Sequence, residues 1–467
     1  MFKNFLSSIT HNGMSLIGTA IAIASLVLIV SLVFMAYLGF EGGPYLGILT
    51  FLILPMFFIL GLILIPLGAF LYRRRLRKVH GDAEAARLPV FDLNLPRTRQ
   101  WLFVLLGVTM VNVVVLAGVT YKGVEVMESV EFCGMACHSV MEPEHTAYLR
   151  SAHTRVSCAE CHIGPGADWF VKSKLDGAWQ LVSVAFDLYS RPIPTPLHNL
   201  RPAQETCEQC HWPTKNVGDK LAIRTHYAED EANTELTSAL LLKVGGAEGD
   251  LASGIHWHVD PGLKIRYRSD ETRENIYEVE YTNSDGETKV YRDRKAPEDG
   301  GEWRTMDCVD CHTRPSHKFF PPDLEVDNAL RDGLIDRSLP FVKREAVRIL
   351  DTKYESHDAA REGIATELAA YYASNHPEVA AEKADAIETA GGVLGDLYSY
   401  NVFPHMEIWW NTYPEHIGHT ASEGCFRCHG RRLRTEDRET ISKDCDICHT
   451  VLAEEEENPQ ILGILNP

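Results

Sequence analysis

The stretch Cys158-Ala159-Glu160-Cys161-His162 places two cysteines three positions apart and a histidine directly after the second. All twelve cysteines of the 467-residue chain occur in such close pairs, and a histidine follows every pair. Five pairs enclose two residues, whereas Cys133 and Cys137 enclose three. In chain order the six motifs are Cys133/Cys137-His138, Cys158/Cys161-His162, Cys207/Cys210-His211, Cys308/Cys311-His312, Cys425/Cys428-His429 and Cys445/Cys448-His449.

This pattern is the attachment motif of c-type haem. The two thiols form thioethers to the porphyrin, and the adjacent histidine becomes the proximal ligand of the iron. A structural zinc site needs four ligands per metal and gives no role to a histidine after every pair. Disulfide pairing leaves these histidines unexplained as well. The sequence therefore predicts six covalently bound haem c groups, and the extra residue of the first motif must bulge between its two thioethers.

Three apolar segments without charge precede the motifs, at about residues 15–40, 45–72 and 101–119. A helix of about 20 residues crosses the hydrocarbon of a bilayer, so each segment predicts a transmembrane helix. For the first segment the alternative is a cleaved signal peptide. Its apolar run is longer than the roughly 7 to 15 residues usual for a signal peptide, and no small-residue cleavage site follows it.

The loop 73–100 carries eight Lys and Arg, whereas the turn around Glu41 carries none. Positive loops stay in the cytoplasm, so the amino terminus is also cytoplasmic and the motif-bearing part is periplasmic. The predicted location is the inner membrane of a bacterium, with three spans. Residues 101–467 hold 36 basic and 60 acidic residues, a balance that argues against binding to nucleic acid.

The expected fold is mainly α, with a membrane anchor, a periplasmic multihaem domain and a small β-hairpin insertion. The hairpin is predicted within residues 263–293, because Ile276–Tyr281 alternates and Asn283-Ser284-Asp285-Gly286 is a turn signal. Periodic apolar positions from Trp169 to Leu188 predict a helix near the membrane. The expected segments are the anchor 1–125, haems 1–3 in 126–215, the insertion 216–305, haem 4 in 306–323, a helical spacer 324–400, and haems 5–6 in 401–467.

Haem iron can take a second axial ligand, and fourteen histidines remain after the six proximal ones. More histidines are present than positions to fill, so some must be ordinary core or surface residues. The preferred candidates lie close to a motif or in a tight pair, and a methionine thioether three residues after His138 is a further candidate. The candidate distal ligands are Met141, His153, His226, His256, His258, His317, His405, His416 and His419.

These stretches resemble the NapC/NirT/NrfH family of membrane-anchored multihaem quinol dehydrogenases. The resemblance covers about residues 101–320, interrupted by 213–305. The part around Asn401-Val402-Phe403-Pro404 and the fifth motif is similar to inner-membrane cytochromes of metal-reducing bacteria. The matching stretches are Phe132-Cys133 through Met141-Glu142-Pro143, Ser151-Ala152-His153 before the second motif, Cys207-Glu208-Gln209-Cys210-His211, and Cys308-Val309-Asp310-Cys311-His312 followed by His317.

The resemblance implies oxidation of menaquinol or ubiquinol from the membrane quinol pool near haem 1. It also implies transfer of electrons to a periplasmic cytochrome or reductase. Met141 matches the family's methionine near haem 1, and His153 and His317 match distal ligands. The family's acidic quinol-site position aligns with Gln180, so this chain departs from the family there. It also departs in having three predicted spans where the family has one, and six predicted haems where the family usually has four. The candidate quinol site comprises Met141, Glu142, Lys172, Lys174, Asp176 and Gln180.

Two other functions compete with quinol dehydrogenase. The chain could be the electron-transfer subunit of a larger membrane complex whose quinone site lies on another subunit. A haem reductase of a small oxyanion would need an open coordination position, and a lysine in place of a motif histidine would be its sign. No motif has that lysine, so this third function is disfavoured.

Overall fold

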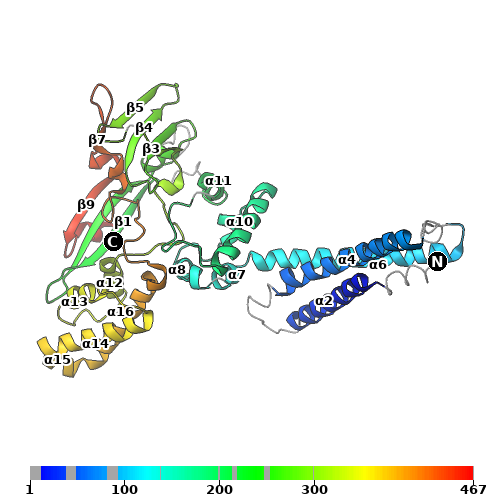
Figure 1. The fold of residues 1–467 in the computed structure, drawn as a ribbon. Helices are drawn as coiled ribbons and strands as arrows, with labels where there is room; N and C mark the ends of the chain where they lie inside the picture. The colour runs from blue at the N-terminus through cyan, green and yellow to red at the C-terminus, as the bar shows by residue number, and fades with distance from the viewer. Residues whose placement is uncertain are drawn as a thin grey trace. The chain divides into compact units, whose positions relative to one another are not determined.

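A computed structural model describes residues 12–37, 49–80, 93–136, 138–197, 200–212, 218–246, 253–297 and 299–465. These residues belong to two compact units, 1–138 and 139–467, whose elements are labelled in Figure 1. Cys137 lies outside the described residues, as do the side chain of His138 and positions 81–92 of the basic loop. Positions 38–48, which include the end of the first expected span and the start of the second, lie outside them as well.

The first unit contains two apolar helices packed against each other, α2 (Gly13–Tyr37) and α4 (Leu54–His80), with the short π-helix η1 (Leu49–Ile53) ahead of the second. Glycine allows the close approach, because a Cβ built at Gly61 would lie 2.6 Å from the carbonyl oxygen of Gly18. The Ser15 hydroxyl donates to the Ile65 carbonyl across the pair, at 2.9 Å. Most other side chains of the two helices remain exposed and apolar, as lipid contact requires.

Two described helices are long and apolar enough to cross a membrane, over Gly13–Met35 and Leu49–Tyr72. They correspond to the first two expected spans. The third expected segment, 101–119, lies within the helix α6 (Pro96–Met127), which has Pro96 in its first turn. The short helix α7 (Val130–Met135) follows and carries Cys133 of the first motif. The Ser129 hydroxyl caps α7 by accepting from the Phe132 N–H.

In the second unit, short helices and one-turn segments carry the motifs. One longer helix, α10, confirms the helix expected between Trp169 and Leu188. The elements are α8 (His138–Leu149), α9 (Cys158–His162), α10 (Ala167–Ala185), α11 (Ala203–Cys207), and the 3₁₀ segments η3 (Ile255–Val259), η4 (Cys308–Asp310), η5 (Pro404–Met406), η6 (Gly424–Arg427) and η7 (Cys445–Ile447).

The expectation of one small hairpin is wrong, because the unit holds two antiparallel sheets. The predicted hairpin exists as β4 (Ile276–Thr282) and β5 (Thr288–Asp293), with Gly286 at φ +84° in its turn. It belongs to a sheet ordered β6-β3-β4-β5-β7-β8, and the second sheet is ordered β1-β2-β9. The remaining strands are β1 (Asp219–Tyr227), β2 (Glu235–Lys243), β3 (Lys264–Ser269), β6 (Glu302–Thr305), β7 (Gly430–Arg434), β8 (Thr440–Ile441) and β9 (His449–Glu456).

Both sheets join segments that are far apart in the chain. In the larger sheet β5 pairs with β7, which directly follows the fifth motif. In the smaller sheet β2 pairs with β9, which begins at His449 of the sixth motif. The insertion before the fourth motif and the segment carrying the last two motifs therefore share two sheets (Figure 1). A local alternation pattern predicts a strand but not its distant partner, so the sequence did not predict that these two segments share their sheets.

Helices fill the expected spacer and enclose the largest apolar core, which includes Leu339, Ile364, Leu368 and Leu394. Breaks occur near Pro340 and Pro377, as the sequence predicts, because proline lacks a backbone donor. A last short helix, α17 (Gln460–Leu465), follows β9. The spacer helices are α12 (Pro322–Arg331), α13 (Val342–Leu350), α14 (His357–Asn375), α15 (Pro377–Glu382) and α16 (Ala384–Asn401).

Candidate haem-binding and quinol sites

Each described motif forms a single tight turn. In the third, fourth and fifth motifs the histidine N–H donates to the carbonyl of the first cysteine, at 2.8, 2.9 and 3.0 Å. Such a turn brings positions i, i+3 and i+4 to one side of the backbone. The two thiols and the imidazole can therefore meet one porphyrin from the same side.

The structure brings four motif histidines close to four of the candidate distal histidines, with the two rings of each pair tilted or perpendicular to each other. Their ring centroids are separated by 5.8 to 6.2 Å. A fifth motif histidine, His312, interacts electrostatically with the candidate His256, which lowers the pKa of His312 after the larger effect of burial. The pairs are His162 with His317, His211 with His153, His429 with His258, His449 with His419, and His312 with His256.

These separations fit an iron atom between the rings. An iron bound at about 2 Å by one nitrogen of each imidazole holds the two ring centroids roughly 6 Å apart. Two pairs also contain a buried nitrogen without a hydrogen-bond partner among the described residues, the Nδ1 atoms of His153 and His449. The Nδ1 of His416, which belongs to no pair, also lacks a partner among the described residues, so this feature does not by itself mark a haem ligand.

Hydrogen bonds orient several of the rings. The Nδ1 atoms of His258, His317 and His429 lie 2.8, 3.0 and 2.6 Å from the carbonyl oxygens of Ile255, Glu144 and Ser442. A metal-bound histidine usually donates its second N–H to such an acceptor, which leaves Nε2 for the metal. Burial also lowers the pKa of His162, His258 and His317, and the neutral imidazole is the form that binds iron.

Three candidate distal ligands are not paired with a motif histidine among the described residues. The Nε2 of His226 is 3.8 Å from Glu455, and the Nε2 of His416 is 3.0 Å from Glu274. His405 directs its Nε2 to the Ser139 carbonyl at 2.9 Å. Met141 is half-buried on α8, and its expected haem also involves Cys137 and the His138 side chain, which are outside the described residues.

Thiols of successive motifs, from the second to the sixth, lie within range of electrostatic interaction. The interacting thiols are Cys161 with Cys210, Cys207 with Cys308, Cys311 with Cys425, and Cys448 with Cys425. Among them, the Cys308 side chain hydrogen-bonds to Cys207 and so raises the pKa of the Cys207 thiol.

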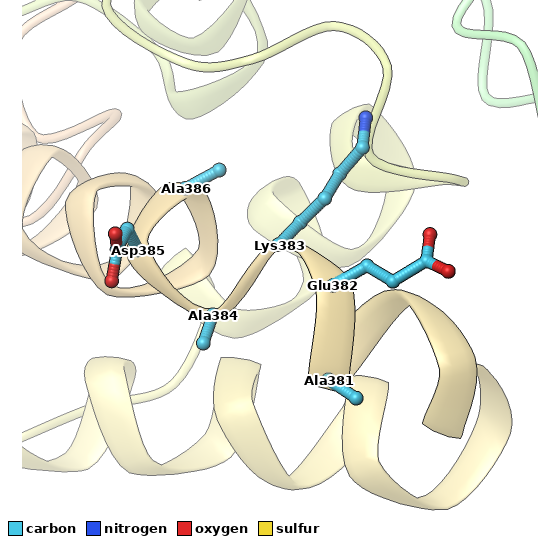
Figure 2. A pocket seen from close by; sticks show the side chains of 6 residues that line it. All are labelled: Ala381, Glu382, Lys383, Ala384, Asp385 and Ala386. Atoms are coloured by element: carbon cyan, nitrogen blue, oxygen red, sulfur yellow. The ribbon is translucent and has the colours of Figure 1, made fainter.

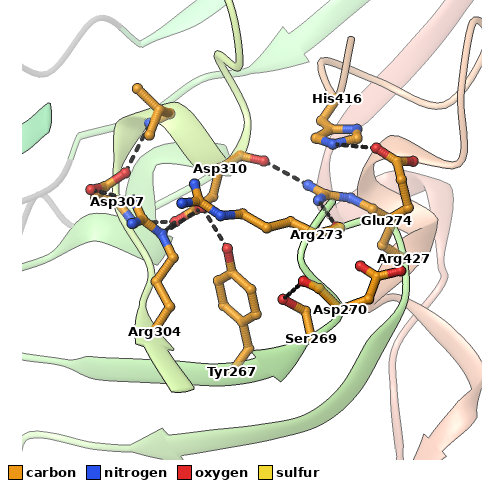
Figure 3. A network of polar contacts seen from close by, with 11 residues as sticks. Tyr267, Ser269, Asp270, Arg273, Glu274, Arg304, Asp307, Asp310, His416 and Arg427 are labelled. Carbon is orange, nitrogen blue, oxygen red and sulfur yellow. Dashed lines mark hydrogen bonds and ion pairs between the residues drawn. The ribbon is translucent and has the colours of Figure 1, made fainter. Parts of the chain in front are cut away.

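A buried polar network ties the fourth motif to the larger sheet (Figure 3). Asp310, which lies between Cys308 and Cys311, is only 2% exposed. It accepts from the Tyr267 hydroxyl at 2.5 Å and from Arg304 Nε at 2.9 Å. Burial, followed by the charge of Asp310, raises the pKa of the Tyr267 phenol, so the hydroxyl keeps its proton. The strands β3 and β6 therefore hold the fourth motif in place.

The same network reaches the fifth motif through Arg427, which lies between Cys425 and Cys428 and is 7% exposed. Its guanidinium donates to the Asp310 carbonyl at 2.6 Å and to the Arg273 carbonyl at 2.7 Å. Figure 3 also shows Glu274 next to His416. Charged residues inside a motif thus connect neighbouring motifs, a role that the sequence analysis missed although their position between two cysteines was visible.

The candidate quinol residues lie on two helices. Glu142, on α8, is 3.5 Å from His405 Nε2 and 4.0 Å from His357 Nδ1. On α10, Lys172 Nζ lies 4.7 Å from the centre of the Trp169 ring, and Lys174 Nζ lies 4.8 Å from that of Phe170. Asp176 is half-buried on the same helix, and Gln180 is exposed.

A shallow hollow of the described surface lies between α15 and α16, lined by Ala381 to Ala386 (Figure 2). Lys383 extends from it to Ser338, with Asp336 at 3.5 Å. None of its lining residues belongs to a motif or to a histidine pair. A second hollow is lined by residues 355–358 with Pro404 and His405, close to Glu142.

Comparisons with known proteins place the chain in a family. The model of the NapC/NirT cytochrome c family, N-terminal region, matches residues 95–192. The chain is 42% identical to the cytochrome c-type protein ImcH of Geobacter sulfurreducens over 454 residues, which are 96% of this chain and 89% of that relative. The chain belongs to the NapC/NirT family of c-type cytochromes.

A second NapC/NirT relative is the cytochrome c-type protein TorC of Escherichia coli K12, 26% identical over 192 residues, 39% of this chain and 48% of that protein. No solved structure matches the chain. Like other NapC/NirT cytochromes, the chain carries covalently bound haem c and takes part in electron transfer at a membrane. The expected resemblance to this family is thereby confirmed.

Proposed function

We propose that the chain is a hexahaem c-type cytochrome of the bacterial inner membrane that oxidises menaquinol or ubiquinol. Its haems relay the electrons to a periplasmic cytochrome or reductase in anaerobic or extracellular respiration. Six motifs supply the attachment cysteines and proximal histidines. The proposed anchor has three spans, with the amino terminus in the cytoplasm and the haem domain in the periplasm.

The observation that carries this proposal is the set of five histidine pairs. Each motif from the second to the sixth has a partner imidazole, and four pairs have the separation that an intervening iron requires. Iron with two histidine ligands has no open position for a small substrate. Electron transfer therefore suits these sites better than reduction of an oxyanion. Met141 is the proposed sixth distal ligand, at haem 1.

The helix α10 supports a quinol site next to haem 1. Lysines beside aromatic rings suit the boundary of a membrane, where the ammonium meets headgroups and the ring stays apolar. In the proposed site, Lys172 and Lys174 orient the quinol head, and Glu142 or Asp176 takes up its protons. Large apolar side chains are exposed along and just after the helix, namely Val171, Leu175, Trp179, Leu181, Val182, Phe186 and Leu188.

The deciding experiment is reduction of the purified, partner-free chain by a menaquinol analogue, followed in the haem absorbance bands with a dithionite endpoint. Rapid and saturable reduction is expected. Met141→Ala and Lys174→Ala should slow reduction by quinol but leave the dithionite endpoint unchanged. Lys220→Ala, at an exposed lysine of β1, is the matched control. Unchanged quinol kinetics in both site variants would contradict the proposed site.

The second candidate function is an electron-transfer subunit of a larger membrane complex with the quinone site on another subunit. The exposed apolar faces of α2 and α4 favour it, because other membrane subunits could bind there. Reduction of the isolated chain by dithionite but not by quinol would support this function, and addition of the missing subunit should then restore reduction by quinol.

A further inference from the structure

We infer that Glu144 and Arg314 together set the reduction potential of the haem at the second motif, with opposite effects. Glu144 lowers this potential and Arg314 raises it. The inference rests on the proposed function in one respect, the assignment of His162 and His317 as the two ligands of that haem. It assigns a role to two residues that belong to no motif.

The geometry begins at His317. Its Nδ1 lies 3.0 Å from the backbone oxygen of Glu144 and 3.3 Å from a carboxylate oxygen of the same residue. With Nδ1 occupied in this way, Nε2 is available to the iron. The His317 ring centroid is 6.2 Å from that of His162, which leaves the required space between them. Glu144 therefore contacts the distal ligand on the side away from the haem.

The carboxylate of Glu144 is held in place by Arg314. One guanidinium nitrogen, Nη2, donates to both carboxylate oxygens at 2.8 and 2.7 Å, while Nε donates to the His317 carbonyl at 2.8 Å. The two side chains are 13% and 14% exposed. The guanidinium also lies 3.9 Å from the centre of the Tyr413 ring. Both charges are thus fixed and shielded from solvent, where screening is weak.

The physical effect follows from charge. The Nδ1–H of His317 donates to the Glu144 backbone carbonyl, and the negative charge of the Glu144 carboxylate lies 3.3 Å from the same nitrogen. A negative charge so close to the imidazole stabilises ferric over ferrous iron. Arg314 is positive and shares the same carboxylate, so it partly cancels the effect. The helix α8 also carries Met141, one turn before Glu144. The same helix thus contributes to the sites of haem 1 and haem 2.

The test is a spectroelectrochemical titration of the full-length protein at one pH, with electron paramagnetic resonance of the oxidised form. In Glu144→Gln the midpoint potential of one haem should rise, and the signal of one low-spin haem should change. In Arg314→Gln the potential of the same haem should fall. The opposite signs separate an electrostatic effect from general damage to the fold, which would not reverse direction between the variants.

Two further variants complete the design. Glu160→Gln removes an exposed carboxylate inside the second motif and should shift that potential less than Glu144→Gln does. The double variant Glu144→Gln/Arg314→Gln leaves no unpaired buried charge and should lie between the single variants. The inference would be overturned if the midpoint potential shifted in the same direction in both single variants. It would also be overturned if this potential did not shift in any of the three variants. Failure of quinol to reduce the protein would overturn the proposed function only, because these potentials are measured without quinol.

Discussion

The guanidinium of Arg427 donates a 2.6 Å hydrogen bond to the backbone carbonyl of Asp310. Each residue stands between the two cysteines of its motif, so this bond joins the fourth and fifth motifs directly. In addition, His256 and His258 lie on one short segment, η3, where His258 is paired with His429 and His256 interacts electrostatically with His312. Two independent connections therefore hold these haem sites next to each other.

Loss of the Arg427 contact should slow electron flow beyond the fourth haem. In Arg427→Gln we expect quinol to reduce the haems of the first four motifs rapidly and the last two more slowly, because one of the two connections between the fourth and fifth motifs is lost. Stopped-flow absorbance at the haem bands measures the fast amplitude, and mass spectrometry checks that every haem remains attached. Arg431→Gln, at an exposed arginine four positions later, should behave as wild type. A full fast amplitude in Arg427→Gln would contradict the prediction.

The histidine pairs predict where an open coordination position can be created. His419 stacks on Phe426 with ring centroids 4.4 Å apart and lies 6.2 Å from His449. His419→Ala should remove one distal ligand, so that the reduced protein binds one additional carbon monoxide, seen in the difference spectrum. His226→Ala should bind no more carbon monoxide than wild type does, because His226 lies next to Glu455 and not next to a motif histidine. Carbon monoxide binding in the His226 variant alone would reverse this assignment.

The helical spacer should show a defined dependence on pH through Glu345. Burial acts to raise the pKa of this carboxyl, but hydrogen bonds from Arg348 and Arg344 outweigh it and hold the pKa below 4.5. A lowered folded-state pKa contributes stability above the unfolded pKa, and this contribution disappears as pH falls through the folded value. Glu345→Gln should cost about 1 kcal/mol at pH 7 and progressively less below about pH 4.5.

Thermal unfolding of the Glu345→Gln variant at several pH values, compared with wild type, measures this difference. Glu362→Gln, at an exposed carboxylate of α14, serves as the control and should change little at any pH. A destabilisation of Glu345→Gln that grows as the pH falls would contradict the sign of the pKa shift.

A buried asparagine connects the strands to the spacer. Asn233 is fully buried, and its amide donates to the carbonyls of Arg337 and Leu339 at 2.9 and 2.8 Å while accepting from the Lys343 N–H at 2.9 Å. Asn233→Ala leaves these backbone groups unsatisfied and should cost about 2 kcal/mol or more. Asn375→Ala, at the exposed end of α14, should cost much less. Chemical denaturation of the two variants distinguishes these outcomes.

Local patterns predicted much of this molecule, since a cysteine pair with its histidine, an apolar run and an alternating strand are each complete within a few residues. The motifs, the two apolar helices, α10 and the β4–β5 hairpin follow from such patterns. Which histidine pairs with which cannot be predicted from such local patterns. Nothing near His258 in the sequence specifies His429, because their proximity depends on how β5 meets β7. For the same reason His405 and His416 looked as suitable as His419, although they lie beside Glu142 and Glu274.

The pairing of β2 with β9 and of β5 with β7 has a consequence for how the protein can be made. A chain that ended after residue 400 would lack β7, β8 and β9, so β5 and β2 would become edge strands without the partners that cover them here. Unpaired strand edges recruit other chains and lead to aggregation. The carboxyl-terminal segment is thus needed to complete the pairing of β2 and β5. We therefore expect a chain shortened to its first four motifs to aggregate more readily than the full-length protein.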